Sequence, residues 1–365
     1  MDLSVYVHIP FCEKKCNYCD FSSFAHMEDY FEDYINALAA EIYNCPELKG
    51  ANIATVFIGG GTPSVLPPKY VGKIMNTLGS FKIASDAEVT IEANPNSLTK
   101  DKLTDYKSFG INRLSIGLQA YQERLLKIMG RPHNARDFLI CIDSAHAAGF
   151  NNISADLIFA LPSQSLIDWA ESLNAVIQAN LNHISCYGLT IEENTPFYNH
   201  YEPINEELDR QMYYKAVDTL SYHGFSQYEI SNFAKEGFAS RHNCTYWERK
   251  NYMGFGLSAH SLYNNTRFEN TCDLKLYLKG DGRRQNIVVL TSKDIMEEFM
   301  FLGLRMTQGV SISKFSKEFG VDIFEVYGGI IKKNIANKLL KIHDDRISLT
   351  DKGIDLSNIV LSEFL

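Results

Sequence analysis

Residues 5–21 read Val5-Tyr6-Val7-His8-Ile9-Pro10-Phe11-Cys12-Glu13-Lys14-Lys15-Cys16-Asn17-Tyr18-Cys19-Asp20-Phe21, and this stretch decides the fold. Three of the eight cysteines fall here, with the spacing C-x3-C-x2-C. An apolar run rich in β-branched residues ends at Ile9, where Pro10 stops it. The pattern predicts a strand that carries a cysteine loop at its C-terminal end, which is where parallel sheets and barrels place their chemistry.

The spacing of the three thiols suits an iron–sulfur cluster, which cysteine thiolates commonly hold. Three protein ligands leave one iron of a four-iron cluster open to an outside ligand. Zinc is the main alternative, because the three cysteines with His8 or His26 would complete a tetrahedral site. The paired C-x2-C knuckles of many zinc sites are absent, however. A loop of merely buried thiols is the other alternative, and the close spacing disfavours it.

The composition is that of a globular protein with a large domain and a smaller one, since the 365 residues are 45% hydrophobic and 22% charged. A net charge of −9 argues against broad attraction to nucleic acid or to an anionic membrane. The first residues show no signal peptide, and no apolar run approaches the roughly 18 residues of a membrane-spanning helix. Cysteines outside the loop are scattered, as in proteins of a reducing compartment. We therefore expect a cytoplasmic protein with no transmembrane segment.

Strand-like and helix-like runs alternate through the first half of the chain. Strands are expected at 3–9, 55–58, 88–92, 113–118, 152–160 and 184–190. Helices are expected at 30–43, 68–78, 100–109, 122–129, 135–148 and 165–179. This alternation predicts parallel pairing through right-handed crossovers. Six strands are fewer than a complete eight-stranded barrel needs, so the prediction is a partial (β/α)6 barrel, with a doubly wound open sheet as the runner-up.

Small and polar residues stand where the predicted strands end. Gly59-Gly60-Gly61-Thr62 follows the second strand, and glycines let the backbone approach a ligand or adopt positive φ. A tight turn is the alternative, while a phosphate loop is disfavoured because no Lys-Ser/Thr follows. Glu92, Gln119 and Asp156 lie at or near the ends of later strands, where a buried polar group needs a partner. They are therefore candidate ligand-binding residues, or else caps of neighbouring loops.

The cysteine loop resembles that of the radical S-adenosylmethionine (SAM) superfamily, whose signature has an aromatic residue before the last cysteine, here Tyr18. The resemblance implies a [4Fe-4S] cluster on Cys12, Cys16 and Cys19, with the open iron chelated by SAM. It also implies that an electron from the cluster cleaves SAM to a 5′-deoxyadenosyl radical. The SAM pocket implied by the resemblance comprises Tyr6, Tyr18, Gly60, Gly61, Thr62, Glu92, Gln119, Arg131 and Asp156.

One branch of the superfamily is the most similar, that of oxygen-independent coproporphyrinogen oxidase and the HemW-type heme chaperones. The supporting strings lie within residues 5–162 and are YVHIPFC, CNYCDF, GGGTPS, IEANP, RLSIGLQ, GRPHN and DLIFALP. Two features favour the chaperone. Cys19 is followed by Asp20-Phe21, whereas the oxidase has a further cysteine two positions after the third. Only Met1–Ser4 precede the cluster strand, whereas the oxidase has a longer extension.

A third feature is Arg241-His242-Asn243-Cys244-Thr245-Tyr246-Trp247, which resembles the HNxxYW stretch of the chaperone branch. The resemblance implies a heme site in which His242 ligates iron while Tyr246 and Trp247 stack on the macrocycle. A core histidine beside a packing tryptophan is the alternative. Cys244 and His260 are further candidate ligands.

The sequence predicts three parts: a radical SAM partial barrel at 1–190, an irregular α/β extension carrying the HNxxYW stretch at 191–290, and a winged-helix-like module at 291–365. The extension has a predicted helix at 206–223, and its segments 264–277 and 279–285 are expected at the surface. The module has predicted helices at 293–306, 311–319 and 323–338 and a hairpin of 339–342 with 346–349. Winged helices often bind DNA, but the acidic charge favours a packing or partner role without nucleic acid.

Together these features predict a heme chaperone that binds heme, a [4Fe-4S] cluster and SAM and passes heme to an acceptor protein. A flavodoxin-like protein or another reductant would supply electrons, and the sequence leaves open whether SAM is cleaved. The alternatives are oxygen-independent coproporphyrinogen III oxidase, which forms protoporphyrinogen IX by radical oxidative decarboxylation, and another porphyrin-modifying radical SAM enzyme of porphyrin biosynthesis.

Overall fold

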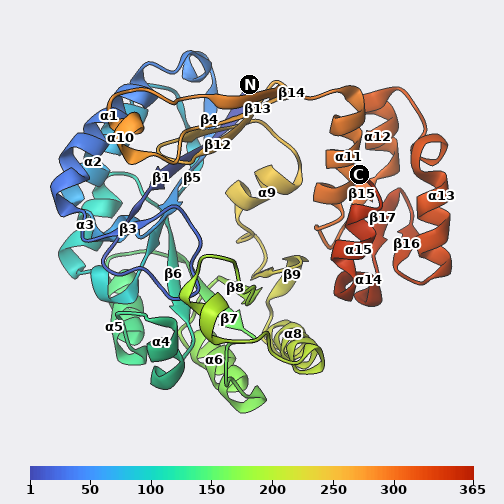
Figure 1. Cartoon of the computed structure of the whole chain (residues 1–365), viewed down its shortest axis with the longest axis horizontal. Helices are drawn as coiled ribbons and strands as arrows, with labels where there is room; N and C mark the ends of the chain where they lie inside the picture. Colours follow the sequence, from blue (N-terminus) through green and yellow to red (C-terminus); the bar gives the residue numbers. More distant parts are fainter.

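The computed structural model describes all 365 residues and is organised around one twelve-stranded sheet (Figure 1). Its centre consists of six parallel strands that lie side by side in chain order. They are β1 (Asp2–Ile9), β4 (Asn52–Gly60), β5 (Ile83–Ala93), β6 (Arg113–Gln119), β7 (Asn152–Phe159) and β8 (His183–Gly188). Because the order never reverses, the sheet is a partial barrel and the doubly wound alternative is wrong.

Helices connect these strands and cover the convex side of the curved sheet (Figure 1). They are α1 (Phe31–Tyr43), α2 (Pro68–Leu78), α3 (Lys100–Ser108), α4 (Glu123–Met129), α5 (Ala135–Ala147) and α6 (Leu166–Gln178). Short 3-10 turns lie at Glu28–Tyr30, Pro46–Leu48, Pro63–Val65 and Pro95–Ser97. The predicted helices are confirmed to within about two residues at each end, which is the usual uncertainty of a helix boundary.

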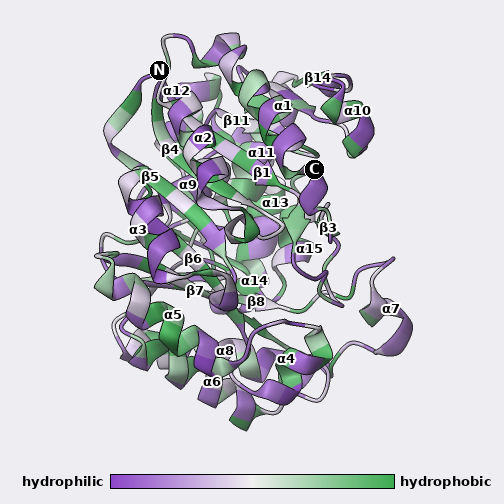
Figure 2. Cartoon of the chain, turned by 90° about the vertical axis from the view of Figure 1, so that its left-hand side faces the viewer, coloured by the Kyte–Doolittle hydropathy of each residue, from purple (hydrophilic) through white to green (hydrophobic).

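Apolar periodicity explains why these segments fold as they do. The spacing of Phe31, Ile35, Leu38 and Ile42 places all four on the buried face of α1. The parallel strands alternate in character: Leu114, Ile116 and Leu118 of β6 join the core, whereas Ser115, Gly117 and Gln119 line a cavity on the other face. Figure 2 shows green hydrophobic segments on the central strands among helices of mixed colour. Strands and helices share one core cluster of 59 buried residues.

The segment that was predicted to be irregular extends the sheet at both edges. Beside β1 lie β11 (Tyr252–Phe255), parallel to it, and then the antiparallel β12 (His260–Tyr263), β13 (Thr266–Glu269) and β14 (Gln285–Val289). Beside β8 lie β10 (Asn232–Ala234) and β9 (Ser226–Glu229). The surface prediction for 264–277 is wrong in part, because Phe268 and Tyr277 are buried in the core. The outermost strands β14 and β9 do not pair, so the barrel stays open.

Three short helices and one long helix complete this part of the chain. They are α7 (Pro196–His200), α8 (Glu206–Tyr222), α9 (Arg241–Trp247) and α10 (Leu274–Leu278). The helix α9 lies on the concave side of the sheet and contacts both β4 and the C-terminal module (Figure 1). A two-stranded pair of β2 (Phe11–Cys12) and β3 (Phe24–Ala25) closes the base of the cysteine loop.

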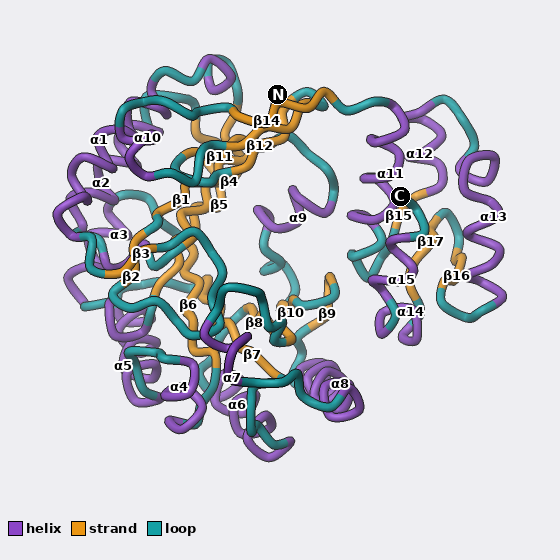
Figure 3. Tube along the Cα trace, in the orientation of Figure 1, coloured by secondary structure: helices purple, strands orange, loops and turns teal.

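The C-terminal module has its own core of 14 buried residues and the helices and hairpin of the predicted winged-helix-like fold (Figure 3). Its elements are α11 (Ser292–Gly303), β15 (Val310–Ser311), α12 (Ile312–Phe319), α13 (Ile323–Ala336), β16 (Leu340–His343), β17 (Arg346–Leu349), α14 (Asp351–Asp355) and α15 (Ser357–Ser362). Thr291 caps α11 through a reciprocal hydrogen-bond pair with Asp294, as its sequence predicts. None of the helices has the length and apolarity needed to cross a membrane.

Candidate functional site

The cysteine loop is fastened to the glycine run that follows β4. The amide of Gly61 donates to the carbonyl of Ile9 at 2.8 Å, and that of Thr62 donates to the carbonyl of Phe11 at 2.7 Å. A Cβ on Gly61 would lie 2.7 Å from the Phe11 carbonyl oxygen, closer than real side chains approach. Glycine is therefore required here by close backbone packing, and Gly60 is required by its φ of +110°.

A cavity of about 470 Å³ lies at the carboxyl ends of the parallel strands. It is lined by Cys12, Cys16, Cys19, Tyr18, Gly60, Gly61, Thr62, Glu92, Gln119, Arg131 and Asp156, among others. All three cysteines and eight of the nine predicted SAM-pocket residues thus line one space, and only Tyr6 stands outside it. Its volume is within the usual range for a small-molecule or cofactor pocket.

Arg131 joins the cysteines to the polar end of the cavity. Its guanidinium lies 3.6 Å from the sulfur of Cys16 and donates at 2.7 Å to the carbonyl of Gly117. It also bonds the side chain of Asn94, while its Nε has no partner. A largely buried arginine with an unused donor suits an incoming carboxylate.

Two buried carboxyl groups also line the cavity. Glu92 accepts a hydrogen bond from the amide of Gly60 at 3.0 Å, and Asp156 accepts one from the hydroxyl of Ser115 at 3.0 Å. Burial, reinforced by the nearby charge of Asp156, raises the pKa of Glu92 to about 8, and burial also raises the pKa of Asp156. Gln119 lines the cavity from a left-handed backbone conformation with φ of +67°, and its amide lies near Arg131 at Gly117. These groups can exchange hydrogen bonds with hydroxyl or amino groups of a ligand.

The zinc alternative does not fit the arrangement. No three histidine, cysteine, aspartate or glutamate side chains converge on a point where one ion could sit. Both nitrogens of His8 are engaged, Nδ1 with the Tyr6 hydroxyl at 3.0 Å and Nε2 with the Ser22 carbonyl at 2.9 Å. Three free thiols border one cavity, and this fits a four-iron cluster, in which each thiolate would bind a different iron.

The HNxxYW stretch folds as α9, which the sequence did not predict as a helix. His242 is 1% exposed, with Nδ1 2.7 Å from the Thr55 hydroxyl and Nε2 2.8 Å from the Tyr246 hydroxyl. Its ring also stacks on Phe57 at 5.1 Å, and burial lowers its pKa to about 3. The structure thus places His242 as a neutral imidazole with both nitrogens engaged.

His242 and Tyr246 border a second, smaller space of about 190 Å³, which we call the lower chamber. Tyr6 lines it as well. The chamber shares Glu92, Ser115, Asp156 and Tyr187 with the cysteine-lined cavity, so the two spaces adjoin. Trp247 borders neither and instead lies against Arg305 of the C-terminal module. The structure therefore brings the predicted heme residues together on α9 but not around one open pocket.

Sequence reasoning missed several residues that line these spaces, among them Asn94, Arg113, Ser115 and Tyr187. Asn94 and Ser115 hydrogen-bond the side chains of Arg131 and Asp156. Ser115 lies two residues before Gly117 on β6, and this alternation could have indicated that it faces the ligand. The same alternation places Arg113 on that face, two residues before Ser115, whereas nothing in the local pattern distinguishes Tyr187.

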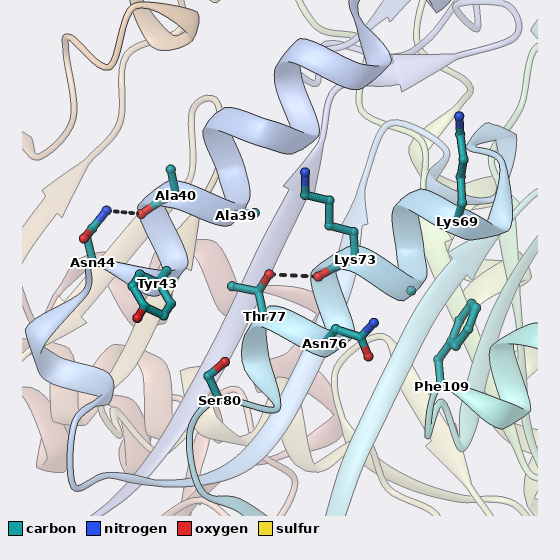
Figure 4. A pocket seen from close by; sticks show the side chains of 11 residues that line it. Ala39, Ala40, Tyr43, Asn44, Lys69, Lys73, Asn76, Thr77, Ser80 and Phe109 are labelled. Atoms are coloured by element: carbon teal, nitrogen blue, oxygen red, sulfur yellow. Dashed lines mark hydrogen bonds between the residues drawn. The ribbon is translucent and has the colours of Figure 1, made fainter.

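A larger hollow of about 740 Å³ lies between α1 and α2 on the outer surface (Figure 4). The hydrogen bonds drawn there, Asn44 to the Ala40 carbonyl at 2.7 Å and Thr77 to the Lys73 carbonyl at 2.8 Å, are local helix contacts. The hollow holds no cysteine, histidine or carboxylate. Despite its size, it has none of the chemistry found at the cysteine-lined cavity.

Comparison with known families agrees with this geometry. Residues 6–176 match the family model of the radical SAM superfamily, and residues 290–356 match the HemN C-terminal domain. The fold is that of a radical SAM protein. The solved structure of coproporphyrinogen III oxidase (HemN) from Escherichia coli superimposes with a TM-score of 0.86 at 21% identity, over 99% of this chain and 89% of that one.

Curated relatives narrow the class further. The chain is 38% identical to the heme chaperone HemW of Bacillus subtilis, over 99% of both chains. It is 35% identical to the heme chaperone HemW of Lactococcus lactis, over 99% of this chain and 97% of the relative. The chain belongs to the HemW family, in the branch of the radical SAM superfamily that includes oxygen-independent coproporphyrinogen oxidase.

Proposed function

We propose that the protein is a heme chaperone that binds a [4Fe-4S] cluster, SAM and heme and transfers heme to an acceptor protein. The observation that carries this proposal is the 38% identity, over 99% of both chains, to a protein named as a heme chaperone. The absence of a cysteine two positions after Cys19 agrees with it.

We assign the cluster to Cys12, Cys16 and Cys19, which all border the cavity. When bound, the cluster supplies an electron that can cleave the sulfonium of SAM. Two residues of this chain would hold the cysteine ligands in place around the cluster. Thr62 donates its hydroxyl toward the sulfur of Cys12 at 3.6 Å, and the Arg131 guanidinium stands 3.6 Å from Cys16. Both contacts stabilise thiolates, whose ionised form is the cluster ligand.

We assign SAM to the same cavity, with its carboxylate beside the cysteines and its ribose at the buried carboxyl groups. Arg131 would hold its carboxylate through the unpartnered Nε, and the backbone at Gly60 and Gly61 would approach its amino group. Glu92, Gln119 and Asp156 would accept or donate hydrogen bonds to the ribose hydroxyls. Tyr18 lines the cavity beside the cysteines, whereas Tyr6 would reach the adenosine only from the lower chamber.

We propose that heme binds at α9 and that this helix moves when heme binds. His242, Tyr246 and Trp247 would contribute to heme capture. The lower chamber, at about 190 Å³, is smaller than the roughly 300–1,000 Å³ of small-molecule pockets, so a macrocycle cannot lie inside it. Coordination by His242 therefore requires Nε2 to exchange the Tyr246 hydroxyl for iron as α9 opens. We propose that the protein works in the cytoplasm and receives electrons from a flavodoxin-like protein or another reductant. In this proposal, residues 1–190 hold the cluster and SAM, residues 191–290 carry α9, and residues 291–365 form the module that α9 contacts.

The test is an anaerobic heme titration by absorbance on the cluster-loaded full chain. We expect saturable binding of about one heme per chain, weakened or spectrally changed by His242→Ala. The matched control is His343→Ala, which removes an exposed imidazole paired with Asp344 in the C-terminal module and should leave binding unchanged. Tyr246→Phe should strengthen coordination, because it frees Nε2 without removing the ring.

The outcomes separate the candidate functions. Absence of saturable binding by the unaltered protein would overturn the chaperone proposal. Conversion of coproporphyrinogen III to protoporphyrinogen IX by the same preparation would establish the oxidase alternative. Tight heme binding that His242→Ala leaves unchanged would keep the function and assign the ligand to Cys244 or His260.

A further inference from the structure

Arg113 is a buried arginine without a partner. It opens β6, is 2% exposed, and its guanidinium makes no hydrogen bond or salt bridge in the structure. Arg131, the other arginine at the site, bonds Gly117, Asn94 and Cys16. Burying a charge without compensation is costly, so proteins rarely keep such a group unless something pairs with it. Its side chain faces the lower chamber.

The other groups around the chamber are already committed. His183 bonds the Ser154 hydroxyl at 2.7 Å and the Tyr228 hydroxyl at 2.8 Å, and His242 is held as described above. Burial lowers the pKa of both imidazoles, so neither adds a positive charge. Glu92 and Asp156 accept hydrogen bonds from Gly60 and Ser115, and burial raises the pKa of both carboxyls. The guanidinium of Arg113 is thus the strongest donor in the chamber, and none of the surrounding oxygens lies within hydrogen-bonding distance of it.

The side chain of Asn243 also borders the chamber and makes no hydrogen bond there. A planar guanidinium presents several N–H donors in a fork that matches the two oxygens of a carboxylate. A chamber of about 190 Å³ is large enough for a few non-hydrogen atoms and too small for a ring system. Charge, donor geometry and size therefore all describe a short carboxylate.

We propose that the lower chamber binds a small carboxylate on Arg113, beneath the SAM end of the cysteine-lined cavity. The ligand would enter from that cavity, since the two spaces share Glu92, Ser115, Asp156 and Tyr187. Bound SAM would then lie over the entrance and retain a free acid, whereas a tetrapyrrole arm would need that entrance clear. The carboxylate is either a free short-chain acid or the propionate arm of a tetrapyrrole, and the second source rests on the proposed function.

The competing explanation is that Arg113 balances Glu92 and Asp156 at a distance, with only water in the chamber. The two explanations differ in what a substitution does. If Arg113 awaits an anion, Arg113→Met removes an uncompensated charge, so the ligand-free protein becomes as stable or more stable. If Arg113 is needed to balance the two carboxyls, the same change destabilises the protein and no anion affects it.

The test follows the thermal unfolding midpoint of the full, cluster-loaded chain without SAM. Sodium propionate is titrated against sodium chloride at equal ionic strength. We expect propionate to raise the midpoint by about 2–4 °C at saturation, and Arg113→Met to abolish the rise. Arg136→Met, which removes an exposed arginine of α5, is the matched control and should keep the full response.

A propionate response that is absent in the unaltered protein, or equal in Arg113→Met, overturns the proposal. A second measurement needs no variant. In carbon-13 NMR, the signal of carboxyl-labelled propionate should shift or broaden when SAM-free protein is added. An excess of unlabelled propionate should restore the signal of the free acid. If Arg113→Met does not fold, this measurement alone decides, and an unchanged signal overturns the site.

Heme and its dimethyl ester distinguish the two sources. If the tetrapyrrole arm is the ligand, the ester binds at least tenfold more weakly than heme, and Arg113→Met removes the difference. If a free acid is the ligand, heme and ester bind equally while the propionate response persists. If propionate raises the unfolding midpoint but the protein binds no heme, the proposed function is refuted and the carboxylate site is retained.

Discussion

Trp247 and Arg305 lie face to face, with the guanidinium carbon of Arg305 4.4 Å from the centroid of the Trp247 ring. The same arginine approaches Glu229, a fully buried carboxylate of β9, at 3.4 Å. The last residue of α9 is thus bound to the C-terminal module, so an opening of α9 would be transmitted to that module.

Removing this contact should loosen the module without unfolding it. A cation–π contact at a half-desolvated site contributes about 1–2 kcal/mol, so Trp247→Ala should speed hydrogen exchange in α11 by roughly tenfold or more. Exchange measured by mass spectrometry checks this, with Arg136→Ala as the exposed control. Unchanged exchange in α11 would mean that other contacts hold the module.

Glu298 is the second connection between barrel and module. Its carboxylate oxygens pair with Arg249 at 2.7 Å and with Arg267 at 2.6 Å, and Arg249 and Glu298 are both almost fully buried. Because Glu298→Ala leaves a buried guanidinium unpaired, we expect a loss of about 2–4 kcal/mol in the free energy of unfolding. Urea unfolding checks this against Glu297→Ala, whose partner Lys293 is exposed and whose loss should cost under about 0.5 kcal/mol.

The stability of SAM-free protein should depend on pH through Glu92. Its pKa in the folded chain is about 8, raised first by burial and then by Asp156, against about 4.5 when unfolded. The folded state therefore keeps a proton that the unfolded state loses, so the stabilising effect is full below about pH 4.5 and disappears as pH rises through about 8.

Glu92→Gln should flatten this dependence and raise stability at pH 8 by about 1–3 kcal/mol. Urea unfolding from pH 5 to pH 9 measures it, with exposed Glu123→Gln keeping the original slope. A slope that Glu92→Gln leaves intact would show that the carboxyl is hydrated and ionised like a surface group.

Cluster ligation makes a simple prediction for the thiols. Single serine substitutions of Cys12, Cys16 or Cys19 should reduce iron and sulfide content after anaerobic reconstitution to near background, because each thiolate holds a separate iron. Cys272→Ser, which changes an exposed thiol away from the cavity, should retain the full content. Stoichiometric zinc in place of iron in the purified protein would contradict the assignment.

Gly61 of the glycine run and Gly329 of α13 offer a stability test, because alanine should have opposite effects on the free energy of unfolding at the two positions. Gly61→Ala forces a Cβ to 2.7 Å from the Phe11 carbonyl and should cost about 1–3 kcal/mol. Gly329→Ala lies in α13 with no atom within 4 Å of the new Cβ, so it should stabilise by about 0.5–1 kcal/mol. Urea unfolding compares the two, and a neutral Gly61→Ala would mean that the cysteine loop can shift.

The sequence allowed the centre of the fold to be predicted because its signals are local. Pro68 begins α2 and Gly79 follows it, and the predicted bounds of that helix match the structure. The cysteine spacing and the small or polar strand ends indicated one site, since parallel strands bring their carboxyl ends together.

What escaped prediction depends on partners remote in sequence. The segment of α9 has no apolar period, and its helix begins where Ser240 caps it and the carboxylate of Glu88 accepts the amides of Arg241 and His242. The surroundings of His242 come from Thr55, Phe57 and Tyr246, which no local pattern connects. Arg113 likewise reads in the sequence as the first residue of a strand. Only the structure shows that its buried guanidinium has no hydrogen-bond or ion-pair partner.

The pairing of β1 has a consequence for how the chain is made. Val5 pairs on one side with Val56 and on the other with Met253. During translation, one edge of β1 therefore remains unpaired until β11 has been synthesised. Unpaired apolar strand edges are prone to non-native pairing and aggregation. The loop that carries Cys12, Cys16 and Cys19 is synthesised well before β11, so its supporting strand lacks one neighbour until β11 has been translated.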